Sequence, residues 1–175
     1  MVASLDYRTV LSKKEDGRVT GFTILFLPRS EAFGLLEYMA VADGWRSRGL
    51  GAALFRHCIQ TTLEERGRPL PVLVEVDSDR EESADRALRA RRQQFYRRLG
   101  CFRIAGLAYI LPLPGETPPP EMDLLIYPNG NLREFPKRDL EAWLKVIYRI
   151  VYDCPQEDPR IKRMLDSIFD PARLE

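Results

Sequence analysis

Runs of β-branched, aromatic and other apolar residues, separated by short polar turns, recur along the first three quarters of the chain. Runs of this kind, ended by glycine, proline or charged residues, are typical of strands. They predict strands over residues 5–12, 18–28, 34–42, 71–77, 102–113 and 122–127. The short turn at residues 14–17 predicts that the first two strands form a hairpin.

Apolar residues at helical spacing predict helices between these strands and after them. The helices are expected over residues 50–65, 86–99 and 136–152, and from Pro159 to about Phe169. The apolar face of the first consists of Leu50, Leu54, Cys58, Ile59 and Thr62, and that of the third of Leu140, Trp143, Leu144, Ile147, Ile150 and Val151. Because strands and helices alternate, the pattern predicts an α/β (α+β) fold in which helices cover a mixed sheet.

The composition is ordinary for a globular protein. The 175 residues favour one domain that buries a core without a disulfide or a metal. Its 27 basic and 26 acidic residues nearly cancel, which argues against nucleic acid as a partner. No apolar run approaches the ~20 residues of a membrane-spanning helix, and the N-terminus lacks the pattern of a signal peptide. Three cysteines without metal-type spacing and a single histidine predict reduced thiols in a cytoplasmic protein and no metal site.

The strongest chemical signal lies in residues 41–52. Gly49 and Gly51 stand at the predicted start of a helix, with Arg46 and Arg48 just before them. The first backbone N–H groups of a helix have no partners within it, and the helix dipole favours negative charge there. Glycines let a phosphate approach this backbone closely. The segment therefore predicts a phosphate or pyrophosphate ligand, and the alternative is that its glycines only shape the turn into the helix.

Two common phosphate-binding motifs do not fit this segment. A P-loop needs Lys followed by Ser or Thr after its last glycine, where this chain has Ala52 and Ala53. A dinucleotide-binding fingerprint needs its first glycine at the end of the strand, but about seven residues separate Val41 from Gly49. The position of its third glycine holds Leu54.

Two segments resemble motifs of the GCN5-related N-acetyltransferases, the GNAT family. The acetyl-CoA pyrophosphate loop of that family is similar to the pattern formed here by Val41, Arg46, Gly49 and Gly51. Residues 95–102 (FYRRLGCF) resemble the Tyr-x-x-x-Gly-Phe block that ends a later helix of the family. The strand predicted over 71–77 lies between the two blocks, as in the family. The resemblance covers roughly residues 5–127.

The resemblance implies a GNAT-like sheet, mostly antiparallel, that splays open between the strands over 34–42 and 71–77 and is flanked by helices. It implies an acetyl-CoA-binding core at 1–128 and a C-terminal helical extension at 129–175 packed on the same domain. The strand and two helices with which the family's fold begins are expected to be missing. We expect the extension to take their place beside the acceptor, either within the chain or across a homodimer.

The resemblance also implies how acetyl-CoA is held. The pantetheine arm would pair with the backbone of residues 39–41 as an added strand does, and the pyrophosphate would lie on the N–H groups of residues 46–52. The expected cofactor-binding residues are Met39, Ala40, Val41, Arg46, Ser47, Arg48, Gly49, Leu50, Gly51 and Ala52.

The activity that the resemblance implies is acetyl-CoA-dependent N-acetyl transfer by direct attack of a primary amine on the thioester. The acceptor is a small amine, a lysine or a protein N-terminus, and the sequence does not distinguish them. The alternative is a non-catalytic module that binds acyl-CoA.

Three residues are candidates for catalysis. Tyr96 matches the family's general acid, which protonates the departing thiolate, and its alternative role is a core aromatic residue. Glu75 lies where members that acetylate protein N-termini carry a glutamate, and Glu37 competes with it for the role of general base. A partly buried glutamate has a raised pKa, which suits a base, whereas the alternative for each is a solvated charge. Backbone N–H groups near residues 39–41 are the expected oxyanion donors.

The chain departs from the family pattern in its second predicted helix. Arg89 and its neighbours stand where most members have an asparagine that contacts the cofactor, so no such contact is expected. Seven arginines and no acidic residue lie within residues 86–103. They predict a site for the 3′-phosphate of CoA or for an acidic substrate, and the alternative is a solvated helix face.

Overall fold

The computed structural model describes residues 6–80, 82–113, 121–130 and 132–175. Its contacts divide the chain into two compact units, Met1–Val74 and Glu75–Glu175. The division falls inside strand β4 (Val72–Asp77), so this strand contributes residues to both units.

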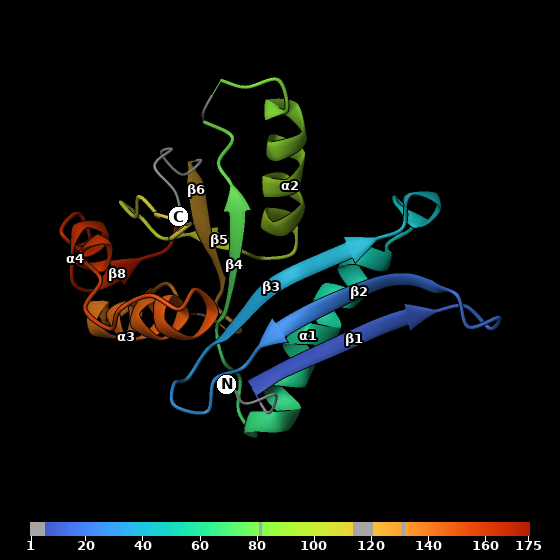
Figure 1. Cartoon of the computed structure of the whole chain (residues 1–175), viewed down its shortest axis with the longest axis horizontal. Helices are drawn as coiled ribbons and strands as arrows, with labels where there is room; N and C mark the ends of the chain where they lie inside the picture. Colours follow the sequence, from blue (N-terminus) through green and yellow to red (C-terminus); the bar gives the residue numbers. More distant parts are fainter. Residues whose placement is uncertain (1–5, 81, 114–120, 131) are drawn as a thin grey trace. The chain divides into compact units, whose positions relative to one another are not determined.

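The first unit is built on three antiparallel strands and one helix (Figure 1). Strands β1 (Tyr7–Lys13) and β2 (Val19–Phe26) form the predicted hairpin, and β3 (Gly34–Val41) pairs with the other edge of β2. In the hairpin turn the N–H of Gly17 donates to the carbonyl of Lys14 at 2.9 Å. Gly17 has a φ of +80°, which glycine adopts without strain.

Strand β3 carries a β-bulge at Glu37. Leu36 pairs with Leu25 of β2 and Tyr38 pairs with Ile24, so Glu37 is the extra residue between two regular pairs. Bulges redirect side chains and are frequent beside active sites. The bulge therefore sets the direction of one of the two candidate bases.

Helix α1 (Leu50–Arg66) packs on β2 and β3 within the first unit. Its buried residues are Leu54, Phe55, Cys58 and Thr62. The helix ends at Gly67, whose φ of +65° and N–H bond to the carbonyl of Leu63 at 2.9 Å close its last turn. The predicted helix over 50–65 is confirmed, and the burial of Phe55 widens its predicted apolar face.

Gly21 of β2 is tightly enclosed. A Cβ added there would lie 2.9 Å from the carbonyl oxygen of Ala40 and 3.0 Å from the side chain of Leu54. Real Cβ atoms essentially never come within 3.0 Å of another heavy atom, so the backbone of β3 would have to shift. The absence of a side chain at Gly21 thus lets the first turns of α1 pack closely on the sheet.

We expect Gly21→Ala to lower the free energy of unfolding by about 1–3 kcal/mol, because a backbone carbonyl cannot move aside as a flexible side chain can. Gly44→Ala is the control, since a Cβ at Gly44 would meet nothing within 4 Å. Its free energy of unfolding should stay within about 0.5 kcal/mol of the wild-type value. Chemical denaturation measures both variants, and equal stabilities would contradict the close packing at Gly21.

The second unit begins with the end of β4 and continues its sheet in the order β4–β6–β5. Strand β6 (Met122–Tyr127) pairs antiparallel with the short β5 (Phe102–Arg103). Beyond β4 the N–H of Ser78 donates to the carbonyl of Glu121 at 2.9 Å. Helix α2 (Arg86–Arg98) links β4 to β5.

The C-terminal part of the second unit is helical, with one short two-stranded sheet. Helix α3 (Lys137–Val146) continues directly into a π-helical turn, η3 (Ile147–Val151), and α4 (Pro159–Leu165) follows. Strands β7 (Glu134–Phe135) and β8 (Ala172–Arg173) pair antiparallel. The buried residues of these helices are Leu140, Trp143, Leu144, Ile147, Tyr148, Ile161, Met164 and Leu165. The prediction of a helix over 136–152 is confirmed, with a change from α to π geometry after Val146.

The predicted strand over 102–113 is wrong beyond its first two residues. After β5, this part of the described chain forms isolated bridges in place of a ladder. Gly106 turns the chain with a φ of +77°, and a Cβ there would lie 2.9 Å from the carbonyl oxygen of Ser167. The apolar residues of this segment are therefore buried by packing, which their sequence pattern does not distinguish from strand pairing.

The observed elements confirm the predicted α/β (α+β) fold with a mostly antiparallel sheet flanked by helices. Three of the described strand pairings in the larger sheet are antiparallel, and that of β3 with β4 is parallel. No helix in the described part of the chain combines the length and the apolar character that crossing a membrane requires. The division into a core at 1–128 and an extension at 129–175 stays a prediction.

Candidate functional site

The predicted cofactor loop joins β3 to α1 in the first unit. It begins with a short 3-10 turn, η2 (Asp43–Trp45). Ser47 with a φ of +60° and Gly49 with a φ of +82° then turn the chain into the helix. Left-handed residues bring neighbouring N–H groups together in concave arrangements that bind anions. Positive φ strains a residue such as Ser47, and strain of this kind is common at ligand sites.

The first turn of α1 fits an anionic group. Ala53 is the first residue whose N–H bonds within the helix, to the carbonyl of Gly49 at 3.0 Å. The N–H groups of Leu50, Gly51 and Ala52 therefore point out of the helix end, and no side chain of the N-cap residue Gly49 covers them. A Cβ at Gly49 would meet nothing within 4 Å, so the space beside this backbone is open. A phosphate or pyrophosphate group fits this arrangement of donors.

Arg46 and Arg48 place two positive charges in the same loop. Arg46 forms an ion pair with Asp43 at 2.9 Å, and its Nε lies 3.4 Å from the carbonyl oxygen of Val41. Both side chains of the ion pair are well exposed, so the pair contributes little free energy. Arg46 could therefore give up its ion pair with Asp43 for one with a phosphate at little cost in free energy.

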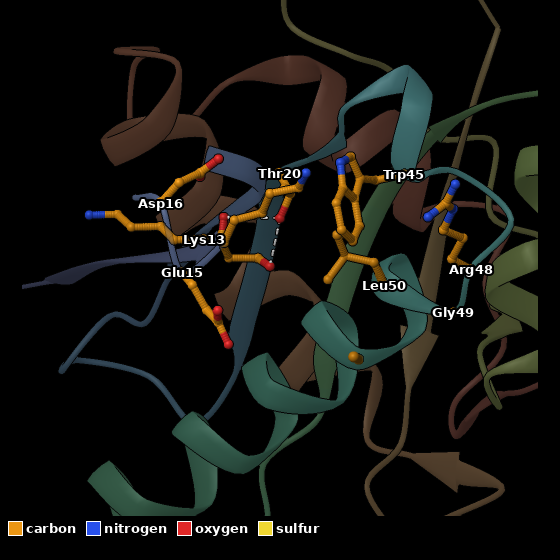
Figure 2. A pocket seen from close by; sticks show the side chains of 11 residues that line it. Lys13, Glu15, Asp16, Thr20, Trp45, Arg48, Gly49 and Leu50 are labelled. Atoms are coloured by element: carbon orange, nitrogen blue, oxygen red, sulfur yellow. Dashed lines mark hydrogen bonds between the residues drawn. The ribbon is translucent and has the colours of Figure 1, made fainter. Parts of the chain in front are cut away.

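A pocket of about 800 Å³ adjoins this loop (Figure 2). It is lined by the β1–β2 turn on one side and by Trp45, Arg48 and the start of α1 on the other. The Trp45 ring has the Lys14 Nζ 4.8 Å from its centre and the Arg48 guanidinium 5.2 Å from it. Cation–π contacts of this kind are attractive, so they hold the loop against the hairpin turn.

The edge of β3 that faces away from β2 offers backbone groups to a ligand. Among the described residues, the parallel pairing with β4 uses residues 34–36 of β3 and none after them. The N–H of Ala42 donates to Thr20 of β2 at 2.9 Å. Since N–H groups alternate along a strand, those of Met39 and Val41 point to the other edge. An extended ligand can pair there as an added strand does.

Glu37 lies beside the phenol of Tyr7 in the first unit. The phenol is hydrogen-bonded to Glu37, and burial together with the negative charge of Glu37 raises the pKa of Tyr7 above its usual range. Tyr7 therefore stays protonated and holds the carboxylate of Glu37 by a charge-assisted hydrogen bond.

Glu75, on the part of β4 that belongs to the second unit, is bonded by two phenols. Tyr109 donates to its Oε1, and Tyr152 donates to its Oε2 at 2.6 Å. Burial raises the pKa of the Glu75 carboxyl, and the two hydrogen bonds offset part of that effect because they favour the ionised form. Burial and the nearby charge of Glu75 raise the pKa of Tyr109 well above its usual value, so this phenol stays a donor.

Tyr96 lies near the end of α2 and is 7% exposed. Its ring packs edge to face on Phe95 with 5.1 Å between the ring centres. Its carbonyl accepts the N–H groups of Leu99 and Cys101, each at 3.0 Å, where the helix ends. The structure thus fixes the backbone of Tyr96 firmly at the helix end.

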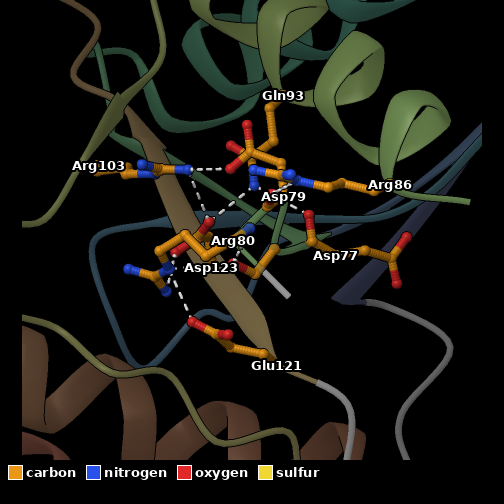
Figure 3. A network of polar contacts seen from close by, with 9 residues as sticks. Asp77, Asp79, Arg80, Arg86, Gln93, Arg103, Glu121 and Asp123 are labelled. Carbon is orange, nitrogen blue, oxygen red and sulfur yellow. Dashed lines mark hydrogen bonds and ion pairs between the residues drawn. The ribbon is translucent and has the colours of Figure 1, made fainter. Parts of the chain in front are cut away.

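The arginine-rich segment is extensively paired with acidic residues of the second unit (Figure 3). Arg103 contacts Asp79 at 2.8 Å and Asp123 at 3.1 Å. Further ion pairs join Arg86 to Glu82, Arg89 to Asp85 and Arg92 to Asp77. Carboxylates therefore already compensate these four arginines, which supports a structural role for them. Arg89, at the position of the family's asparagine, is among the four.

Gln93 ties α2 to the end of β4 within the same network. Its Nε2 donates to the carbonyl of Asp77 at 3.0 Å and to the carboxylate of Asp123 at 2.8 Å. Tyr96 follows Gln93 by one helical turn, and Glu75 precedes Asp77 by two residues. The network therefore fixes the elements that carry two of the candidate catalytic residues.

A sequence model of the acetyltransferase (GNAT) domain matches residues 6–100, which is more than half of the chain. The chain belongs to the GNAT family of acetyltransferases. The match includes both segments that resemble the family, the loop at 41–52 and the block at 95–102 except its last two residues. No curated protein matches this GNAT chain in sequence.

Solved structures share the GNAT fold with this chain at low sequence identity. A GNAT-family protein from Bacteroides thetaiotaomicron has 20% identity over 86% of this chain and 75% of its own, with a TM-score of 0.61. Nourseothricin acetyltransferase has 23% identity over 71% of this chain, which spans 66% of that protein, with a TM-score of 0.56. The ribosomal-protein-S18-alanine N-acetyltransferase of Escherichia coli has 20% identity over 73% of this chain and 72% of its own, with a TM-score of 0.53. At these identities the neighbours show the fold alone.

The sequence does not single out Tyr109 and Tyr152, the two residues that bond Glu75. Tyr109 lies in the run over 102–113, where it looks like one more apolar residue of a strand. Tyr152 closes the predicted helix over 136–152. Neither pattern indicates where a hydroxyl group finds its partner, so only the tertiary structure reveals the cluster.

Proposed function

We propose that this GNAT protein transfers an acetyl group from acetyl-CoA to a primary amine. The observation that carries the proposal is the start of α1, where outward N–H groups, an open space at Gly49 and two arginines lie together in the loop that resembles the family's pyrophosphate loop. The acceptor is a small amine, a lysine or a protein N-terminus. The named neighbours do not narrow this choice, because they share the fold at low identity.

We assign the role of general base to Glu75. An amine is protonated near neutral pH and must lose a proton before its nitrogen can attack. Burial raises the pKa of Glu75, which brings it closer to the pH at which a base works best. Glu37 is the alternative base. The assignment of Glu75 is supported by its two phenol donors, Tyr109 and Tyr152.

The proposed step is a direct displacement. The nitrogen attacks the thioester carbon, the new C–N bond forms, and the C–S bond breaks. Two protons leave the nitrogen overall, of which one passes through Glu75 to solvent and the other replaces the proton that Tyr96 gives to the thiolate. The resemblance to the family assigns the stabilisation of the developing negative oxygen to backbone N–H groups near residues 39–41.

We expect Gly49→Ala to weaken acetyl-CoA binding about tenfold or more, because a Cβ would project into the open space where a phosphate approaches the backbone. Gly17→Ala is a matched control, since Gly17 has a φ of +80° against +82° at Gly49 and also meets nothing within 4 Å. Both variants carry the same backbone strain, and only Gly49→Ala should change the Kd. Titration calorimetry measures both, and equal Kd values would contradict the assigned loop.

Thermal unfolding with and without acetyl-CoA tests the proposal as a whole. Binding to the folded state alone raises the Tm as ligand concentration exceeds the Kd. No shift at millimolar acetyl-CoA would overturn both acetyl transfer and the alternative of a non-catalytic acyl-CoA-binding module. A shift without turnover of any primary amine would favour that module.

A further inference from the structure

Both oxygens of the Glu75 carboxylate are engaged by phenols from distant parts of the second unit. Tyr109, in the segment after β5, donates to Oε1. Tyr152, directly after the π-helical turn η3, donates to Oε2 at 2.6 Å. A buried carboxylate with one donor on each oxygen is held in a single orientation, because any rotation breaks both hydrogen bonds.

The two phenols leave capacity for a third partner. An ionised carboxylate offers about four lone-pair sites, and the phenols use one on each oxygen. The carboxylate is deeply placed, but Glu75 as a whole residue is not fully enclosed by the described part of the chain. The cluster can therefore still accept a proton or an N–H group from an incoming amine.

The position of Tyr152 is fixed by its surroundings. Tyr148, one turn earlier in η3, is fully buried, and its hydroxyl donates to the carbonyl of Ile110, the residue next to Tyr109. The N–H of Cys154 donates to the carbonyl of Tyr148 at 2.9 Å. The C-terminal segment thus bonds to the Tyr109 segment through the Tyr148 hydroxyl and to Glu75 of β4 through the Tyr152 hydroxyl.

We propose that Tyr152 and Tyr109 are positioning residues for the reaction, which hold the Glu75 carboxylate in one orientation and leave a lone pair of each oxygen for the acceptor amine. The inference rests on the proposed function. It gives the segment after β7 a part in the site, because that segment supplies Tyr152 to Glu75 within the same chain.

The inference predicts a specific effect on the titration of Glu75. Among the described residues, the ionisable groups that act on it are Tyr109, Tyr152 and Tyr148, and the guanidinium of Arg160, which pairs with Asp158, stacks on the Tyr148 ring. Each bonded phenol favours the ionised carboxylate. Loss of either hydroxyl should therefore raise the pKa of Glu75 further, which follows from the loss of a hydrogen bond to a charged group.

The test is an NMR titration of the full chain labelled with ¹³C in its glutamate carboxyl groups, with the Glu75 signal identified by Glu75→Gln. We expect Tyr152→Phe to move the titration midpoint of Glu75 to a pH about one unit higher. The acidic limb of the pH profile of kcat/KM should move by the same amount. Tyr109→Phe should act in the same direction.

Tyr148→Phe is the matched control, since it removes a hydroxyl from the same turn that binds a backbone carbonyl. Its Glu75 titration should stay within a few tenths of a pH unit of the wild type. If the buried Tyr109→Phe variant does not fold, Tyr152→Phe carries the test alone, because Tyr152 is only half-buried.

The titration needs no turnover, so it tests the role of Tyr152 and Tyr109 independently of the proposed acetyl transfer. An unchanged Glu75 midpoint in folded Tyr152→Phe would overturn the inference, even if the enzyme acetylates amines. A shifted midpoint in a protein that acetylates no amine would overturn the proposed function and leave the link between Tyr152 and Glu75 intact.

Discussion

Glu75→Gln is expected to lower kcat/KM for amine acetylation by about 100- to 10,000-fold, the range in which a positioned general base contributes. Gln keeps the size of the side chain and an oxygen that accepts from one phenol, so the cluster with Tyr109 and Tyr152 is disturbed little. The Kd for acetyl-CoA should stay unchanged, because the proposed cofactor contacts lie in residues 39–52, at the end of β3 and in the loop before α1. Steady-state kinetics and titration calorimetry measure the two quantities.

The raised pKa of Glu75 also predicts how the rate of the wild-type enzyme changes with pH. Glu75 works as a base only when ionised, and burial raises its pKa above that of an ordinary glutamate. The wild-type rate should therefore fall as the pH drops through this raised pKa. In Glu75→Gln the acidic limb at that pH should disappear from the residual activity.

Glu37→Gln is the matched control for this experiment. Glu37 is hydrogen-bonded to the phenol of Tyr7, and it is the other candidate base. We expect its kcat/KM to stay within a few-fold of the wild type. A large loss in Glu37→Gln together with near-normal rates in Glu75→Gln would transfer the role of base to Glu37.

Asp123→Ala is expected to lower the free energy of unfolding by about 3 kcal/mol, because its removal breaks a buried ion pair. The Asp123 side chain is 4% exposed and accepts from Arg103 at 3.1 Å, from Arg80 at 2.9 Å and from Gln93 at 2.8 Å. Arg103 also pairs with Asp79, and Arg80 also pairs with Glu121, so both arginines keep a partner in the variant. The expected loss of free energy of unfolding therefore lies at the lower end of the range for broken buried ion pairs. The Tm should fall by about 6–12 °C.

Asp16→Ala is the control for the charge change, since Asp16 pairs with Arg18 on the surface with both side chains more than half exposed. An exposed pair contributes less than about 1 kcal/mol. Thermal and chemical unfolding compare the two variants. A loss at Asp123 no larger than that at Asp16 would contradict the structural role of the network.

Local features of the fold could be predicted from the sequence, and long-range ones could not. The hairpin, α1 and β6 appear close to their predicted bounds, because turn residues and apolar spacing act over a few positions. The strand over 102–113 shrinks to two residues, because Gly106 turns the chain and its neighbours pack against the C-terminal segment. Strands β7 and β8 were not predicted, because each has only two residues and so shows no alternation of apolar and polar residues.

The candidate site divides in the same way. The loop before α1 could be identified because its glycines and arginines are contiguous and their chemistry depends on the start of one helix. The surroundings of Glu75 could not be identified from the sequence, because its phenol partners lie 34 and 77 residues away along the chain. The sequence could propose Glu75 and Glu37 as bases, and the structure supplies the burial and the phenols that favour Glu75.

The most direct test of the account is the release of free CoA from acetyl-CoA by the wild-type chain in the presence of primary amines. The panel should contain small amines, peptides with an internal lysine and peptides with a free N-terminus, and mass spectrometry should identify the acetylated product. The account predicts that CoA release requires an amine, that the product is its acetamide, and that Glu75→Gln loses this activity while still binding acetyl-CoA. A wild-type protein that binds acetyl-CoA and releases no CoA with any amine of the three classes would contradict it.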